Sequence, residues 1–235
     1  MFDNSTWSML GTQESAFGKS LPQQIADFIA TEILQGRLHP GDRLKEEELA
    51  EKFQTSRAPV REALYLLQID GLVERQPRRG TVVKAYTQKE IRELYEVRQG
   101  LELIAVERLR QVWNRQAAQR FHAVLADMER ALANADAEAY SESNEAFHEL
   151  MFDLAGNEVL LRLYRQLQNL LRLLLRLSTQ EPAQMRASYE EHRAIVAALE
   201  RGDFEEARRV LADNVNHGLH RALGTRGEVS PSSRK

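Results

Sequence analysis

The sequence predicts a mainly α-helical protein of two parts, a winged helix-turn-helix domain followed by a six-helix bundle. Apolar residues recur at the three- and four-residue spacing of helices over most of the chain. Strand-like segments occur only between positions 72 and 84, where two short apolar stretches flank a turn. Six further helical segments joined by short loops follow, which is typical of a bundle. A length of 235 residues also favours two domains.

The expected domain limits follow the change in pattern. Residues 1–20 and 224–235 are polar and rich in small residues, so we predict a mobile N-terminal arm and a mobile tail. Residues 21–85 form the first domain and residues 86–223 the second. The boundary falls where the strand signal ends and a capping sequence opens a long helix.

Composition narrows the setting in which the protein works. The chain has no cysteine, which excludes disulfides and thiolate chemistry and is compatible with a reducing compartment. Residues 1–20 lack the basic start and apolar run of a signal peptide. The most apolar stretch, residues 160–177, contains four arginines, which excludes a membrane span. We therefore expect a cytoplasmic protein that does not associate with membranes.

The first domain has the outline of a winged helix-turn-helix. Helices are predicted over residues 21–36, 45–53 and 56–69, with Ser56 capping the third and Pro59 tolerated in its first turn. Strands are predicted over residues 72–75 and 81–84. The second and third helices are only a few residues apart, as this motif requires.

In such a domain the third helix enters the major groove of DNA with its N-terminus first. The residues predicted to lie nearest the DNA are therefore Ser56, Arg57, Ala58, Pro59 and Arg61. The two arginines are four residues apart and share one helix face, and arginine is suited to bidentate contact with guanine. The helix N-terminus adds backbone N–H groups for a phosphate.

The hairpin tip is the second predicted DNA contact. Arg78, Arg79, Gly80 and Thr81 lie there, and such a tip can reach phosphates or a minor groove. Residues 57–84 contain six basic and three acidic side chains, although the whole chain has a net charge of −3. Any one arginine alone is more simply a solvated surface residue. The order and position of all of them together favour DNA binding.

Helices of the second domain are predicted over residues 88–113, 114–134, 136–155, 157–178, 182–201 and 203–224, the first opened by a Thr87–Glu90 capping box. Arg98 lies in the first of these helices, at the boundary of its apolar face. A partly buried arginine requires an anionic partner. That partner is either an internal carboxylate such as Glu102 or the carboxylate of a ligand.

The first domain resembles the GntR family of bacterial transcription regulators. The resemblance is carried by ILQGRLHPGDRL (33–44), LAEKF (49–53), SRAPVREAL (56–64), GLV (71–73) and RGTVV (79–83). It implies a homodimer on a short inverted repeat of double-stranded DNA, with Arg57 and Arg61 reading guanines and Gly80 at the wing tip. One departure is Gln54-Thr55, where the family usually has glycine followed by an apolar residue.

The second domain resembles the effector (FCD) domain of the FadR branch, in its six-helix VanR-like form. The resemblance rests on YEVR (95–98) with Glu102, on FH (147–148), on AGN (155–157), on EH (191–192) and on GD (202–203). It implies that the bundle binds a small organic acid, with Arg98 holding the carboxylate. It also implies a regulator that represses transcription.

Many members of this branch hold a divalent metal such as zinc or nickel with one aspartate and three histidines. The corresponding residues here are Asn144, His148, His192 and Asn214, so two ligands are amides. These four, with Arg98, are the predicted effector-binding residues, and the four are the candidate metal ligands. The alternative is that the two histidines only form hydrogen bonds in a polar pocket. An amide oxygen can coordinate a metal, but it lacks the charge that strengthens binding.

The predicted function is a ligand-responsive, sequence-specific DNA-binding repressor that is not an enzyme. One alternative is a constitutive DNA-binding dimer whose bundle serves only dimerisation. Another is a metal-dependent hydrolase fused to a DNA-binding domain. The sequence shows no nucleophile–base pairing and no glycine-rich phosphate loop, which argues against the enzyme.

Overall fold

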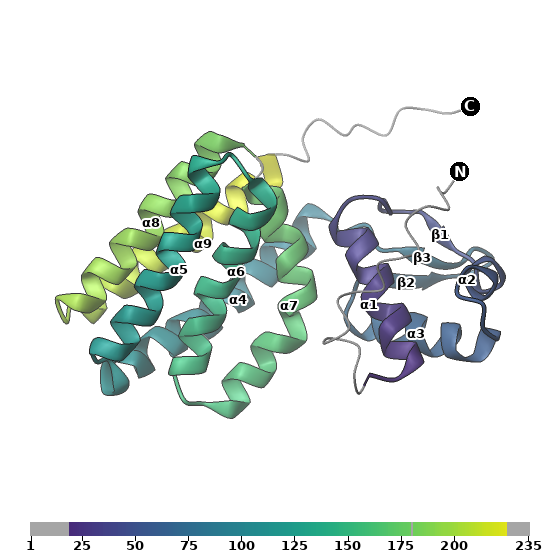
Figure 1. Ribbon diagram of the computed structural model, residues 1–235, viewed down its shortest axis with the longest axis horizontal. Coiled ribbons are helices and arrows are strands. Elements are labelled where there is room, and N and C mark those ends of the chain that lie inside the picture. The colour runs from purple at the N-terminus through teal and green to yellow at the C-terminus, as the bar shows by residue number, and fades with distance from the viewer. Residues whose placement is uncertain (1–18, 180, 225–235) are drawn as a thin grey trace. The chain divides into compact units, whose positions relative to one another are not determined.

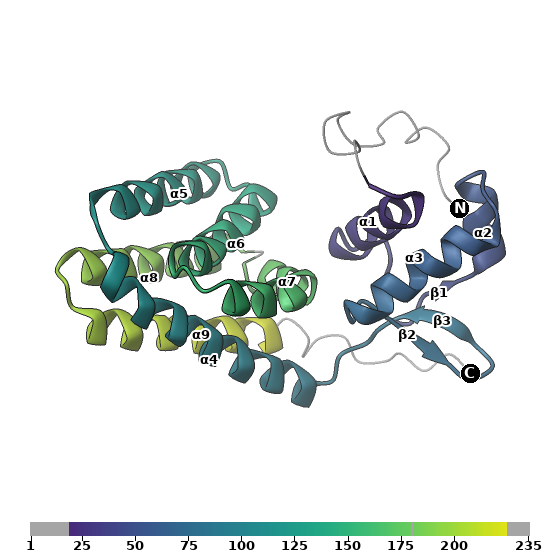
Figure 2. The same ribbon diagram turned by 90° about the horizontal axis from the view of Figure 1, so that it is seen from below.

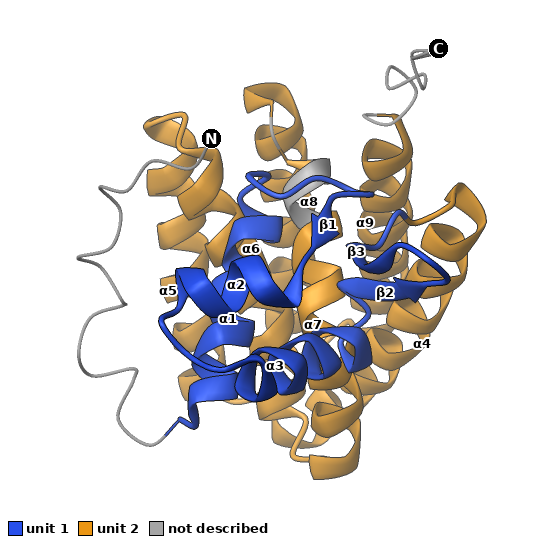
Figure 3. Ribbon diagram, turned by 90° about the vertical axis from the view of Figure 1, so that its right-hand side faces the viewer, with its two compact units in different colours: residues 1–85 blue, residues 86–235 orange. Residues whose placement is uncertain are grey.

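The computed structural model describes residues 19–179 and 181–224. Nearly all of the predicted arm and tail therefore lies outside the described residues. The chain divides into two compact units, residues 1–85 and 86–235, coloured separately in Figure 3. Each unit has a hydrophobic core of its own.

The described residues of the first unit, from position 19 on, form three helices and a small sheet (Figure 1). Its helices and strands are α1 (Leu21–Leu34), β1 (Arg43–Leu44), α2 (Glu46–Lys52), α3 (Arg57–Ile69), β2 (Val73–Gln76) and β3 (Gly80–Val83). The strands pair antiparallel in the order β1-β3-β2. One face of α3 packs on α1 and supplies Val60, Ala63, Leu64 and Leu67 to the core. The winged helix-turn-helix prediction is confirmed.

The wing hairpin is shifted slightly from its predicted limits. β2 begins and ends one residue later than predicted, and β3 begins and ends one residue earlier. Gln76 pairs with Gly80, so only residues 77–79 form the loop. Arg78 and Gly80 adopt positive φ values of 63° and 78°, which lets this short loop reverse the chain.

Gln54, between α2 and α3, holds a backbone conformation that favours glycine. Its φ is 49°, in the left-handed region. We expect Gln54→Gly to stabilise the protein by about 0.5–1 kcal/mol, because relief of this strain exceeds the entropy that glycine adds to the unfolded chain. Urea unfolding measures the change. The control Gln68→Gly, inside α3, should destabilise by about 1 kcal/mol; a loss of stability in both variants would contradict the prediction.

The described residues of the second unit form a bundle of six helices, which Figure 2 shows from below. They are α4 (Gln88–Val112), α5 (Arg115–Ala133), α6 (Ala137–Leu154), α7 (Glu158–Ser178), α8 (Pro182–Glu200) and α9 (Phe204–Gly224). Helix α4 packs against α6 and α9, and α8 packs against α5, α6 and α9. The Thr87–Glu90 capping box is formed, with the Glu90 N–H donating to Thr87 Oγ1 at 3.2 Å. None of the helices in the described ranges combines the length and the apolar composition that a membrane span requires.

Candidate functional site

The outer face of α3 presents the residues expected to read DNA. The side chains of Arg57 and Arg61 are 59% and 68% exposed, while the neighbouring Val60 is fully buried. Tyr65, one turn beyond Arg61, is also exposed and continues the same face. Its four-residue spacing from Arg61 could have identified it in the sequence as a further candidate contact.

The start of α3 differs from prediction in one detail. Ser56 occupies the N-cap position, but within the described part of the chain its side chain makes no capping hydrogen bond. The third helical residue is Pro59, which has no N–H for the serine to accept from. Ser56 and Ala58 are exposed and Pro59 is partly exposed, so the helix N-terminus lies open.

Two glutamates at the start of α2 hold the arginines of α3. Arg57 Nη1 lies 2.8 Å from Glu47 Oε1, and Arg61 Nη2 lies 2.8 Å from Glu46 Oε2. The hydrogen bond from Arg61 lowers the pKa of the Glu46 carboxyl, and the charges of Arg61, Arg75 and Arg57 act in the same direction. These carboxylates were not singled out from the sequence. They keep the arginine side chains oriented at the face that would meet DNA.

The wing tip is exposed and basic. Arg78, Arg79 and Gly80 are exposed, and Thr81 is partly buried in β3, where it pairs with Leu44. Arg79 Nη1 donates to Gln76 Oε1 at 3.2 Å, a bond across the base of the loop. The tip therefore presents two guanidinium groups to the surroundings, as a phosphate contact requires.

The predicted effector residues come together inside the bundle. Arg98 of α4 is 2% exposed, and its Nε donates to Glu102 Oε1 at 2.6 Å. Its Nη2 donates to His148 Nε2 of α6 at 2.9 Å. His192 of α8 is fully buried, and its Nε2 lies 3.3 Å from His148 Nε2. Four side chains from three helices thus make one buried polar cluster.

The charges in this cluster balance. Burial alone would raise the pKa of Glu102, but the positive charge of Arg98 and hydrogen bonding from His148 and Arg98 lower it to about 2. Burial would lower the pKa of Arg98, and the Glu102 carboxylate raises it instead. Burial lowers the pKa of His148, and it lowers that of His192 to about 3. At neutral pH the cluster therefore holds one ion pair and two neutral imidazoles.

A cavity of about 10 Å³ adjoins the cluster. It is lined by Arg98, Asn144, His148, Ser188, Asn214, Gly218 and Arg221. This volume suffices for about one water molecule. Asn144 Oδ1 is buried there and accepts no hydrogen bond from any residue in the described ranges. All five predicted effector residues lie in the cluster or on the cavity wall.

A second carboxylate, not anticipated from the sequence, organises the far side of the cavity. Glu191 accepts from Asn214 Nδ2 at 2.7 Å and from His217 Nδ1 at 2.9 Å, and pairs with Arg221 at 3.2 Å. Asn214 and Arg221 are seven residues apart on α9, which places them on one face two turns apart. That seven-residue spacing is the feature of the sequence from which Arg221 could have been predicted to lie near Asn214. His217 binds Glu191 and does not line the cavity.

The four candidate metal ligands match a dication poorly. Asn144 and Asn214 contribute no charge, and Asn214 already donates to Glu191. The Nε2 atom of His148 already accepts from the Arg98 guanidinium. Within residues 19–179 and 181–224, no three His, Cys, Asp or Glu side chains are arranged to hold a metal ion.

The two buried histidines predict a stability that falls in acid. The pKa of each is lower in the folded protein than its ordinary value of 6.5. Unfolded chains therefore take up protons that folded chains exclude as the pH falls below 6.5. We expect about 1.4 kcal/mol of lost stability from His192 between pH 7.5 and 5.5, and a further loss from His148 in the same direction.

Urea unfolding of the full chain at several pH values measures this dependence. His192→Gln should remove the part of this loss that His192 contributes, and His217→Gln, at an exposed histidine, is the matched substitution for comparison. A stability that is flat between pH 7.5 and 5.5 would show that neither histidine is held neutral.

Comparison with known proteins identifies a matching family for each of the two units. Residues 21–83 match the gntR family of bacterial regulatory proteins, and residues 93–217 match the FCD domain. A probable D-xylose utilization operon transcriptional repressor of Paenarthrobacter nicotinovorans is 32% identical over 218 residues, which cover 89% of this chain and 92% of that protein. The gluconate operon transcriptional repressor of Bacillus licheniformis is 29% identical over 173 residues, covering 74% and 70%.

Among solved structures, E. coli McbR/YncC matches with a TM-score of 0.74 at 25% identity, covering 88% of this chain and 98% of that one. A regulator from Rhodococcus sp. RHA1 matches with a TM-score of 0.75 at 24% identity, over 88% and 99%, and supports the fold. The fold, the family matches and the curated relatives agree along the chain. The protein belongs to the GntR family of transcription regulators and carries a C-terminal FCD domain.

Proposed function

We propose that the protein is a repressor whose DNA affinity is controlled by a small organic acid bound in the bundle. The observation that carries this proposal is the buried Arg98, whose guanidinium is a site for a carboxylate and lies on the cavity wall. The curated relatives include repressors named for D-xylose and gluconate operons. These names support control by a sugar or a sugar-derived acid.

The acceptor atoms in the cavity refine the class of acid. Asn144 Oδ1 has no donor among the described residues, and an amide oxygen can accept from a hydroxyl group. The Arg98 guanidinium has five N–H donors, so it can bind a ligand carboxylate while it keeps its bonds to Glu102 and His148. A ligand with one carboxylate and neighbouring hydroxyls, a hydroxy acid, satisfies both requirements.

The small cavity suggests how binding would be coupled to DNA affinity. A space of about 10 Å³ cannot admit an organic acid, so the ligand must bind a more open state of the bundle. A ligand that binds one state better than the other shifts the population toward it. If the two states present the DNA-binding domains differently, operator affinity changes with the ligand.

The test is a fluorescence-anisotropy titration of an operator obtained by selection from random duplexes. D-gluconate, L-lactate and citrate are added as probes, and calorimetry measures their binding to the protein alone. An acid that binds should weaken operator binding at least tenfold, a coupling of about 1.4 kcal/mol. An acid that binds without changing operator affinity would overturn the coupling. If the protein binds the operator and none of the three acids binds the protein, the result favours a constitutive DNA-binding dimer. The small cavity is compatible with that alternative.

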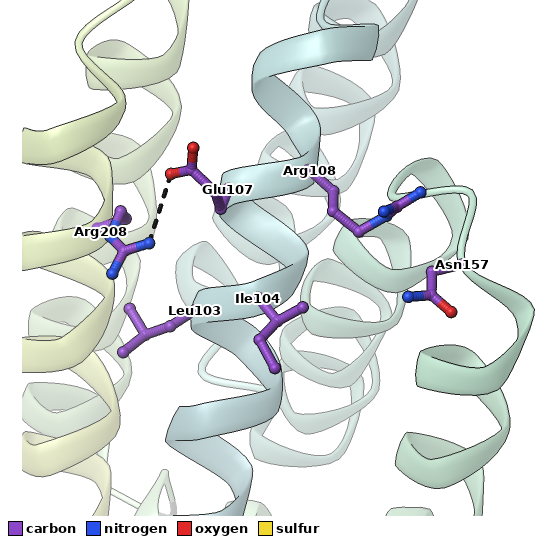
Figure 4. Close-up of a pocket in the computed structure, with 6 residues that line it drawn as sticks. All are labelled: Leu103, Ile104, Glu107, Arg108, Asn157 and Arg208. Atoms are coloured by element: carbon purple, nitrogen blue, oxygen red, sulfur yellow. Dashed lines mark hydrogen bonds and ion pairs between the residues drawn. The ribbon is translucent and has the colours of Figure 1, made fainter.

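We infer that the working unit is a homodimer, because a winged helix-turn-helix reading an inverted repeat needs two copies. An apolar surface suited to self-association lies on α4 and α7. Val97, Ile104, Val159 and Leu163 are each between 45% and 55% exposed. Both Leu103 and Ile104 line a surface hollow of about 270 Å³. Figure 4 shows Leu103 on the side of Arg208 and Ile104 between it and Asn157. Grouped exposed apolar residues of this kind mark interaction surfaces.

Ile104→Glu should weaken this dimer by roughly 30-fold or more, because a carboxylate would be buried at the centre of an apolar contact. Analytical ultracentrifugation over a range of concentrations gives the dissociation constant. The control Gln119→Glu adds the same charge to an exposed position of α5 and should have no effect. An unchanged constant in Ile104→Glu would exclude this surface as the interface.

A further inference from the structure

The two buried histidines converge as metal ligands do. Their Nε2 atoms lie 3.3 Å apart. Two nitrogens bound to one tetrahedral zinc at about 2.0–2.1 Å would lie about 3.4 Å from each other. The spacing of the histidines is therefore that of a metal-binding pair. A metal ion would bind at their two Nε2 atoms, so the side chain that contacts these atoms decides whether a metal can bind.

Hydrogen bonds fix which nitrogen of each ring has the free lone pair. His192 Nδ1 lies 2.6 Å from the carbonyl oxygen of Ser188, so Nδ1 carries the hydrogen and Nε2 is an acceptor. His148 Nε2 lies 2.9 Å from Arg98 Nη2, a guanidinium nitrogen that only donates, so His148 Nε2 is also an acceptor. Its Nδ1 then carries the hydrogen and lies 3.1 Å from the Glu102 carboxylate. Two lone pairs face each other, and that arrangement needs a positive group beside it.

Arg98 supplies that positive group. Its Nη2 donates to His148 Nε2 at 2.9 Å, and its Nε is tied to Glu102 at 2.6 Å. The same carboxylate thus neutralises the guanidinium and orients the His148 ring. The remaining candidate ligands, Asn144 and Asn214, are uncharged. This suits a site whose positive charge is the Arg98 guanidinium, because Glu102 already neutralises that charge.

We propose that the Arg98 guanidinium takes the place of the divalent metal in this cavity, so that the protein works without a metal. The inference rests on the proposed function only in treating the cavity as the effector site. A dication would add two positive charges next to a fully buried arginine, with no carboxylate among the four candidate ligands to offset them. The effector is then held by hydrogen bonds and by the guanidinium.

Metal binding by the full chain tests the proposal without any effector or operator. The protein is incubated with zinc chloride or nickel chloride, passed over a desalting column and analysed for metal by mass spectrometry. Less than 0.1 equivalent per chain is the expected result, at about the limit set by non-specific binding. One equivalent that is lost in His148→Gln/His192→Gln would overturn the proposal. If the wild type and His148→Gln/His192→Gln retain the same amount of metal, that metal is bound elsewhere on the surface, and the result supports the proposal.

A designed gain of metal binding tests the place of Arg98 directly. Asn144→Asp/Asn214→His restores a charged four-ligand set, and calorimetry gives its zinc affinity. Adding Arg98→Met/Glu102→Gln removes the competing ion pair as a unit and should tighten zinc binding at least tenfold. Equal affinities, or no zinc binding by either variant, would overturn the proposal. Circular dichroism checks that each variant folds. If histidine at position 214 prevents folding, the nearly isosteric Asn144→Asp replaces the double variant, and its zinc affinity is compared with and without Arg98→Met/Glu102→Gln.

Discussion

Arg61→Ala is expected to weaken specific operator binding by about 1–3 kcal/mol, roughly 5- to 150-fold, while leaving the fold intact. The side chain is 68% exposed and, among the residues that the structure describes, pairs only with Glu46 at the surface, so its loss costs the folded domain little. On DNA the same guanidinium can form two parallel hydrogen bonds with one guanine. Arg61→Lys should not restore binding, because an ammonium cannot make that bidentate contact.

The comparison that identifies a base contact is between Arg61→Ala and the wing variant Arg79→Ala. Arg79 at the hairpin tip is placed for phosphates, so its loss should weaken specific and random DNA alike and reduce the salt dependence by about one phosphate contact. Arg61→Ala should instead lower the ratio of specific to random binding. Equal effects of Arg61→Ala on both DNAs would show that Arg61 reads no base.

The winged domain was predictable because its signals are local. The apolar spacing in residues 57–69 defines the buried face of α3, and the short connection from α2 leaves few arrangements for the two helices. The errors are small and have local causes. The wing strands moved by one residue because Arg78 adopts a left-handed conformation that the sequence pattern does not announce. Ser56 lost its expected capping bond because Pro59 has no N–H.

The buried cluster was predictable only in part, because its contacts join helices distant in the sequence. The four-residue spacing of Arg98 and Glu102 indicated their possible pairing, and the structure shows it. No local pattern could place Arg98 against His148, fifty residues away. The Glu191–Arg221 pair depends in the same way on the packing of α8 against α9. Resemblance to a family located the histidines in the sequence. Which groups bind their ring nitrogens could be determined only from the three-dimensional structure.

Arg98→Met should cost about 3–5 kcal/mol of unfolding free energy. The reason is the partner left behind: Glu102 is fully buried, and without Arg98 its carboxylate would have no compensating charge. Arg98→Met/Glu102→Gln removes both charges and should recover most of the loss. Urea unfolding of the wild type, both single variants and the double variant gives the coupling energy of the pair.

Arg120→Met is the matched control, because it breaks an ion pair of similar length in a different setting. Arg120 Nη2 lies 2.7 Å from Asp153 Oδ2, and the two side chains are 48% and 49% exposed. Water can therefore solvate the carboxylate that remains, and a loss of at most about 1 kcal/mol is expected. If Arg98→Met costs no more than Arg120→Met, the Arg98–Glu102 pair is not the buried charge centre of the bundle. The role proposed for Arg98 in place of a metal would then lose its physical basis.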